Sequence, residues 1–412
     1  MKINKYFVFA FIYFFINSLG LPQGLLFTSL LSPLLYWWVV STRRFEIMLP
    51  FVIAILPFFI VQAAMGINLG KYLVSLLNMA TVYIFCQAFY TFLLTCQDPE
   101  KIFRRLLIIT FVLCIIAIPF YSSSYYHVFW IKQFLTEGVD NYKRLKLFTY
   151  EASYFATLFT PLFFFYFLQI ILRQNRINAW LLFVLIFTPY LLSFSLGVIA
   201  TVLISLAIIF LLYPAKLLRK RRVLNLAVMI VTLVSVGLVA AVLFFPNNTL
   251  FIRLANIFTG NDISGKGRTT DAFLLSNMIL DQRSHFWGIG PGQLRVLGTD
   301  IIKNFYSYPS DYDVVAIPNA SAETLVIFGW LGLSTRILTE IVLFFYTKVY
   351  RNYYRLALFF FMFIYQFTGS YITSPAEYVI WILAFTNAFP QFNVNPIKYT
   401  HQQWPKKLYG IS

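Results

Sequence analysis

The sequence predicts an all-α polytopic membrane protein with about 12 transmembrane helices. Two observations carry this prediction. Hydrophobic residue types make up 60% of the chain and charged residues only 11%, whereas a soluble domain carries about 25% charged residues to cover its surface. The apolar residues also gather into runs of about 20, the length of a helix that crosses a bilayer. A water-soluble fold is therefore excluded, and we expect a single integral membrane domain over residues 1–412.

The predicted spanning helices follow the apolar runs in chain order. They lie at 6–22, 24–41, 46–64, 72–95, 106–126, 153–172, 179–194, 196–213, 223–245, 322–345, 356–373 and 377–391. The first run is too long and too aromatic for a removable signal peptide, and it lacks a small-residue cleavage site. Only Ser195 separates two of the runs, so a tight turn is expected there.

Positive residues indicate how these helices are oriented. Lys and Arg collect in the short cytoplasmic loops of membrane proteins. With the N-terminus inside, most of the 32 Lys and Arg residues fall in cytoplasmic segments, including the basic run 219–222. We therefore expect both termini in the cytoplasm and the long loops 127–152 and 246–321 on the outside. The net charge of +17 follows this pattern and predicts no nucleic-acid partner.

The second outside loop is predicted to be partly helical. Thr269 or Thr270 can cap a helix that carries Asp271 in its first turn, where an acidic side chain favours the helix dipole. The stretch 272–280 has the spacing of an amphipathic helix. A glycine-rich run at 288–292 follows. Its backbone could approach a phosphate closely, although a flexible turn between helices is an equally good interpretation.

The same loop is rich in cations, namely Arg253, Lys266, Arg268, Arg283, Arg295 and Lys303. Arginine suits diphosphate recognition because its planar guanidinium donates two parallel hydrogen bonds and keeps its charge. Any single cation could instead be solvated or paired with a loop aspartate. As a set beside a membrane, they predict a site for an anionic headgroup.

Two further groups are candidates for proton transfer. Glu151 stands directly before the run 153–172; burial there would raise its pKa towards that of a general base, whereas nearby Arg144 would lower it. The alternative is an interfacial ion pair that anchors the helix. His285 can carry a proton near neutral pH, and a structural role at a helix end fits it equally well.

Other polar groups near the apolar runs are expected to be structural. Arg336 and Glu340 are spaced four residues apart within one run, so they can neutralise each other along a helix face. The three cysteines, Cys86, Cys96 and Cys114, show no metal-ligand spacing, and the three histidines form no cluster. We therefore predict no disulfide, no metal site and no cofactor.

The outside loops contain three short patterns in a fixed order. In the first, Glu151-Ala-Ser stands seven residues after an arginine. In the second, Gly267-Arg268 precedes the predicted helix and the glycine run 288–292. In the third, Asn319 is followed after nine residues by Gly329-Trp-Leu-Gly332.

These patterns and the many-span topology resemble those of the bacterial O-antigen polymerase and O-antigen ligase superfamily. The first is similar to its arginine-to-Glu-Pro-Ser pattern, with Ala152 at the proline and Leu147 at the glycine. The second resembles its Gly-Arg…Gly-x-Gly-x-Gly run. The third matches the ligase pattern His-Asn-x9-Gly-x-x-Gly, except that Pro318 stands at the histidine. Because proline cannot transfer a proton, this departure favours polymerase over ligase.

The resemblance implies a GT-C-like helical bundle and a metal-independent glycosyltransferase without a cofactor. Such an enzyme would polymerise lipid-linked oligosaccharide repeat units into O-antigen or a related surface polysaccharide at the periplasmic face of the inner membrane. Undecaprenyl diphosphate would be the leaving group. The implied partners are undecaprenyl diphosphate-linked glycans, membrane lipid and, as an option, a chain-length regulator protein.

The expected site combines residues named above with Glu323, which follows Asn319 by four positions. The catalytic candidates are Arg144, Glu151, Arg268 and His285. The substrate-binding candidates are Arg253, Arg283, Gly290, Arg295, Asn319 and Glu323. Arginines would stabilise charge on the departing diphosphate, and a carboxylate or histidine would take the acceptor proton. An O-antigen ligase, and a twelve-span secondary transporter or lipid flippase, remain as alternatives.

Overall fold

The computed structural model describes residues 5–19, 21, 26–43, 48–132, 143–172, 174, 177–214, 256, 259, 263–308 and 316–394. This part of the chain is mostly helical, as predicted. Four helices are long and apolar enough to cross a membrane, and shorter apolar helices accompany them. The predicted span at 223–245 and the predicted substrate-binding residue Arg253 lie outside the described residues.

The elements follow one another as α-helices with one small sheet. The first half contains α1 (Lys5–Phe11), the π-helical turn η1 (Ile12–Ile16), α2 (Phe27–Leu30), α3 (Ser32–Arg43), α4 (Leu49–Ala64), α5 (Leu69–Thr95) and α6 (Pro99–Phe120). Next come η2 (Tyr126–Val128), β1 (Trp130–Lys132), β2 (Lys143–Leu145), α7 (Ala152–Leu172), α8 (Ala179–Ser193) and α9 (Leu196–Leu212). The two strands pair antiparallel, with Ile131 opposite Arg144.

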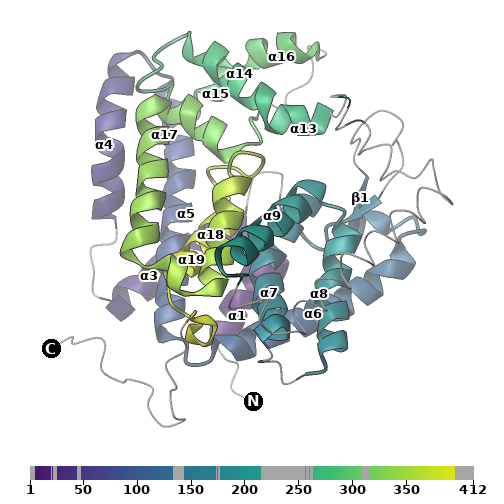
Figure 1. The fold of residues 1–412 in the computed structure, drawn as a ribbon. Helices are drawn as coiled ribbons and strands as arrows, with labels where there is room; N and C mark the ends of the chain where they lie inside the picture. The colour runs from purple at the N-terminus through teal and green to yellow at the C-terminus, as the bar shows by residue number, and fades with distance from the viewer. Residues whose placement is uncertain are drawn as a thin grey trace.

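The later part of the chain holds a group of short helices and then three apolar ones. The short helices are α13 (Ile263–Arg268), α14 (Thr270–Leu280), α15 (Leu294–Leu297) and α16 (Thr299–Tyr306). The remaining elements are α17 (Ala320–Tyr346), η3 (Val349–Arg351), α18 (Tyr353–Tyr365), α19 (Pro375–Phe385) and η4 (Pro390–Phe392). In Figure 1, α13–α16 lie together over one end of the bundle, next to the start of α17.

Several predicted boundaries are corrected by the structure. α6 begins at Pro99, earlier than predicted, because the Asp98 side chain accepts a hydrogen bond from the Lys101 backbone N–H and proline favours the first helical turn. A helix was expected over 356–373, but the helix there, α18, ends at Tyr365. Since α18 and α19 have only 13 and 11 residues, the count of twelve complete spans stays a prediction.

α7 forms the centre of the bundle. Nearly all of its side chains are buried, because the helix is apolar on every side and is packed by α8, α9, α18 and α19. Its fully buried Phe165 packs edge-to-face on Tyr354, Phe389 and Phe392. The N-terminal end of α7, which Glu151 precedes, is therefore attached to a well-packed core.

α14 confirms the predicted amphipathic helix. Leu275 and Ile279 are buried with Ala322 and Leu325 of α17, so the apolar face packs on the bundle. The predicted threonine cap is wrong. Thr269 is the N-cap residue, but its side chain caps no backbone N–H, because its hydroxyl donates to the carbonyl oxygen of Gly265 at 2.9 Å.

Candidate functional site

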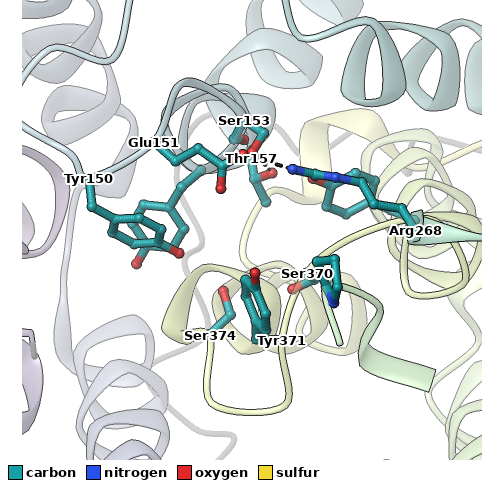
Figure 2. A pocket seen from close by; sticks show the side chains of 11 residues that line it. Tyr150, Glu151, Ser153, Thr157, Arg268, Ser370, Tyr371 and Ser374 are labelled. Carbon is teal, nitrogen blue, oxygen red and sulfur yellow. Dashed lines mark hydrogen bonds and ion pairs between the residues drawn. The ribbon is translucent and has the colours of Figure 1, made fainter. Parts of the chain in front are cut away.

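A pocket opens where the start of α7, the end of α13 and the turn between α18 and α19 meet (Figure 2). It is lined by Tyr150, Glu151, Ser153, Tyr154, Thr157, Arg268, Pro318, Tyr365, Ser370, Tyr371 and Ser374. Eight of these side chains carry a hydroxyl group. The pocket therefore joins one ion pair to a wall of neutral hydrogen-bonding groups.

The ion pair connects the first and second sequence patterns. Nη2 of Arg268 donates to Oε1 of Glu151 at 2.9 Å, and the two side chains are 28% and 14% exposed. Within the described part of the chain, Glu151 is the only hydrogen-bond acceptor of the Arg268 guanidinium. A guanidinium has five N–H donors, so most of those on Arg268 remain available to a ligand.

The pair also fixes the charge state of both groups. Burial by itself would raise the pKa of the Glu151 carboxyl, but the charge of Arg268 and hydrogen bonds from Ser153 and Arg268 outweigh burial and hold the pKa below its ordinary value. Burial likewise opposes the charge of Arg268, and Glu151 more than compensates, so the pKa of Arg268 is raised. Glu151 is thus an ionised partner of Arg268, and its low basicity fits orientation of the arginine better than proton abstraction.

Arg144 lies behind this pair and outside the pocket lining. It is buried on β2, and its Nε donates to the carbonyl oxygen of Ser193 at the end of α8. Its charge contributes to the lowered pKa of Glu151. In the sequence between Arg144 and Glu151, Leu147 has a φ of +48°, which lies in the left-handed region that favours glycine. The backbone therefore turns at Leu147 at a conformational cost.

Asn319 connects the third pattern to the second. Its Oδ1 caps α17 by accepting from the backbone N–H of Ala322 at 2.9 Å. Its Nδ2 donates to the carbonyl oxygens of Arg268 at 2.8 Å and Phe367 at 2.7 Å. One amide thus fixes the backbone of Arg268 against α17 and the end of α18, which makes Asn319 a positioning residue. The adjoining Pro318 lines the pocket itself.

The glycine run packs against a break in α17. At the break, Gly329 has a φ of +66°. Ile289 donates its backbone N–H to the carbonyl oxygen of Val326 at 2.9 Å, and Gly290 donates to that of Ile327 at 3.0 Å. A Cβ atom at Gly288 would overlap the backbone of Ile327 and Gly329. The glycines therefore permit two backbones to approach each other.

This packing corrects the expected role of Gly290. Its N–H group is engaged by the protein, and the residue lies against the side chains of Tyr72 and Gln62. Gln62 in turn donates from Nε2 to the carbonyl oxygens of Trp287 and Ile327. The run therefore packs against α4 and α17, which agrees with the interpretation as a turn between helices.

The structure places the other loop candidates away from the pocket. His285 is half exposed and its Nε2 lies 2.8 Å from Oδ1 of Asp281. Arg283 donates from Nη2 to the carbonyl oxygen of Gly66 at 2.7 Å, which joins the loop to the turn between α4 and α5. Arg295 is exposed on α15. None of these three lines the pocket.

Glu323 holds the turn between α18 and α19, and that turn lines the pocket. Its Oε2 accepts a hydrogen bond from the backbone N–H of Ile372 at 2.7 Å. Ser370, Tyr371 and Ser374 of this turn line the pocket. No sequence pattern predicts them as site residues, because the turn falls at the end of the apolar run 356–373. The polar residues that precede Pro375 were the available signal.

Comparison with family models and with curated proteins finds no match for this chain. Within the described residues, no group of three or more His, Cys, Asp or Glu side chains is placed to hold a metal ion. The lining instead offers one cation with spare donors, one carboxylate and several hydroxyls. This donor set suits a ligand that carries both an anionic group and sugar hydroxyls.

Proposed function

We propose that this chain is a glycosyltransferase that polymerises lipid-linked oligosaccharide repeat units at the outer face of a bacterial inner membrane. The observation that carries the proposal is Arg268, a pocket-lining arginine with spare donors opposite a hydroxyl-rich wall. Three sequence patterns that resemble one superfamily also contribute to the same site. Glu151 pairs with Arg268, and Asn319 holds the Arg268 backbone.

In the proposed reaction, Arg268 binds the diphosphate of the lipid-linked donor. The acceptor hydroxyl forms a new bond to the anomeric carbon, and the bond from that carbon to the diphosphate breaks with its electron pair on oxygen. Arg268 stabilises the charge that develops there, an effect of about 3 kcal/mol by analogy with other preorganised donors. Glu151, the only carboxylate among the described lining residues, holds Arg268 in position, and the proton of the acceptor hydroxyl passes to solvent water.

The position of basic residues supports an outward-facing pocket. α17 begins beside the pocket, and at its far end the chain carries Lys348, Arg351 and Arg355. Short basic segments are retained in the cytoplasm during membrane insertion. This distribution of charge supports a pocket at the outer face, at the opposite end of this helix. No nucleotide-sugar donor is required there, since the lipid diphosphate brings the energy for transfer.

A flippase for lipid-linked glycans is the second candidate. The break of α17 at Gly329 favours it, because transporters use broken helices. An O-antigen ligase is less well supported, since Pro318 lines the pocket where the similar ligase pattern has histidine.

Deletion of the gene separates these functions. For a polymerase, we expect the long glycan ladder to disappear while a single lipid-linked repeat unit remains accessible to external glycosidase on spheroplasts. A repeat unit protected inside the spheroplasts would identify a flippase. Intact undecaprenyl-linked polymer that is absent from lipid A core would identify a ligase. An unchanged ladder would contradict all three.

A further inference from the structure

The turn between α18 and α19 is fixed from both sides. The carbonyl oxygen of Gly369 accepts from the backbone N–H of Ala320 at 3.1 Å. Ile372 donates its N–H to Glu323 and accepts at its carbonyl from the Tyr378 hydroxyl at 2.7 Å. α17 and α19 therefore hold this turn in one conformation, and its side chains meet the pocket at fixed positions.

Ser370 combines two unfavourable features in this turn. Its φ is +67°, a conformation that is strained for any residue with a Cβ atom. Its hydroxyl oxygen is also buried, and no described residue hydrogen-bonds to it. Strained backbone and unsatisfied buried polar groups are both uncommon in folded proteins and concentrate at functional sites. Their coincidence at a pocket-lining residue points to a ligand that supplies the missing hydrogen bond.

The charge of the surroundings indicates which part of a ligand fits. Ser370, Tyr371 and Ser374 form one wall of the pocket, and Glu151 and Arg268 stand across from them (Figure 2). This wall has neutral hydroxyls and no cation, and the carboxylate of Glu323 lies directly behind it on Ile372. An anion is therefore drawn to Arg268, and a neutral polyhydroxylated group suits the turn. A hydroxyl can both donate to and accept from such a group.

We propose that the turn 370–374 is the subsite for the acceptor sugar, with the Ser370 hydroxyl bonded directly to a sugar hydroxyl. This inference rests on the proposed function and deepens it. Tyr371 adds a flat apolar ring with a polar tip, a combination that can cover a sugar ring while it donates a hydrogen bond. The acceptor is then placed across the pocket from the diphosphate that Arg268 binds.

Ser370→Gly is a suitable test because glycine adopts a φ of +67° without strain. The turn should therefore fold normally while the hydroxyl is lost. Ser307→Gly is the matched control, since Ser307 has a φ of +53° at the exposed end of α16 and lies outside the pocket lining. Both variants relieve the same backbone strain, and only the first removes a group from the subsite.

The ligand probe is the repeat-unit oligosaccharide released by mild acid from lipid-linked material of the deletion strain. Its binding to purified full-length protein in lipid nanodiscs is measured beside polymer formation from intact lipid-linked units. We expect Ser370→Gly to weaken oligosaccharide binding about tenfold, the equivalent of one hydrogen bond. Ser307→Gly should bind as the wild type does, and Arg268→Ala should bind the free oligosaccharide within about twofold.

Each of the other outcomes is decisive. Wild-type affinity in Ser370→Gly would overturn the subsite, and so would loss of oligosaccharide binding in Arg268→Ala with retention in Ser370→Gly. If wild-type protein polymerises lipid-linked units but Ser370→Gly matches it in binding and rate, the inference fails while the proposed function stands. If wild-type protein binds the oligosaccharide but forms no polymer from lipid-linked units, the proposed function fails and a sugar-binding turn remains.

Discussion

Two arginines of this chain each pair with glutamate, and they differ in how many donors the protein uses. Arg336, within α17, donates from Nε, Nη1 and Nη2. Its acceptors are the side chains of Thr324, Glu340, Gln366 and Glu377. Arg268, beside the pocket, donates only to Glu151 among the described residues. The guanidinium of Arg336 uses all three of its nitrogens to join helices, whereas that of Arg268 uses one and is suited to a ligand.

The partners of Arg336 show why its role is structural. Glu340 lies one turn along α17, at 3.3 Å from Nε, while Gln366 follows α18 and Glu377 belongs to α19. The cluster therefore ties three helices together in the bundle interior. Gln366 also donates to Glu340 at 2.7 Å, so the carboxylate has two partners. A buried charge that loses its partner is strongly destabilising.

The largest expected effect is on stability, at Arg336. Arg336→Met leaves the carboxylates of Glu340 and Glu377 without their cation, and we expect the free energy of unfolding to fall by about 3–5 kcal/mol. Arg268→Met is the matched variant and should cost about 1 kcal/mol, because its pair is partly exposed. Thermal unfolding in detergent measures both. Equal losses would break the distinction between the two arginines.

Asn319→Ala should give the next largest effect. The change removes the cap of α17 and leaves the carbonyl groups of Arg268 and Phe367 without a donor, so about 1–2 kcal/mol of stability should be lost. Because the Arg268 backbone is then less well placed, polymer formation should fall about tenfold. Asn319→Asp keeps the cap and loses the amide donor. Because the new carboxylate is buried against the carbonyl oxygens of Arg268 and Phe367, this variant should lose at least as much stability as Asn319→Ala and polymerise as slowly.

At low pH, protonation of Glu151 should break its ion pair with Arg268. The folded state lowers the pKa of this carboxyl, so the unfolded state binds more protons between the two pKa values and stability there rises with pH. The contribution of the pair, about 1 kcal/mol, is present above the ordinary pKa near 4.3 and is lost as pH falls through the lowered pKa. Glu151→Gln should remove this pH dependence from the unfolding curve. An unchanged acid limb in that variant would show that Glu151 is not paired.

The smallest effect is expected at Arg295, the exposed cation of α15. Arg295→Ala should leave stability within about 0.5 kcal/mol and polymer length unchanged, because the side chain lies outside the pocket lining. Glycan ladders and membrane protein levels measure both. A strong loss of long chains would mean that the loop cations act as a set, and Arg268 would lose its special position.

Composition and periodicity were sufficient for the helical class. Amphipathic spacing correctly predicted the helix α14, because that pattern is local. It predicted the buried face only in part, since Leu275 and Ile279 are buried whereas Leu274 and Met278 are exposed. The spacing of Arg336 and Glu340 also predicted their contact. By contrast, Glu377 contacts Arg336 only because α19 packs beside α17, and no local pattern records such a pairing. For the same reason, the contacts of Arg336 with Thr324 and Gln366 were not predictable from local sequence.

The site was predictable in its central pair and not in its walls. Sequence patterns predict both Glu151 and Arg268. Whether burial raises the pKa of Glu151 or the ion pair lowers it depends on the distance between the carboxylate and the guanidinium, which the sequence does not give. The glycines of the second and third patterns were visible, but their purpose, close approach of two backbones at Gly288 and Gly329, depends on tertiary contact. Ser370 was not predicted as a site residue, because a short polar turn inside a long apolar run resembles the end of a helix.

The central claim is that the spare donors of Arg268 bind the diphosphate of a lipid-linked glycan. The most direct measurement is the glycan ladder of a deletion strain that carries Arg268→Lys, normalised to the amount of the protein in the membrane. Lysine keeps the charge and loses the planar fork. The account predicts at least about a hundredfold fewer long chains at wild-type protein level, with single lipid-linked units accumulating. A full-length ladder at that protein level would contradict it.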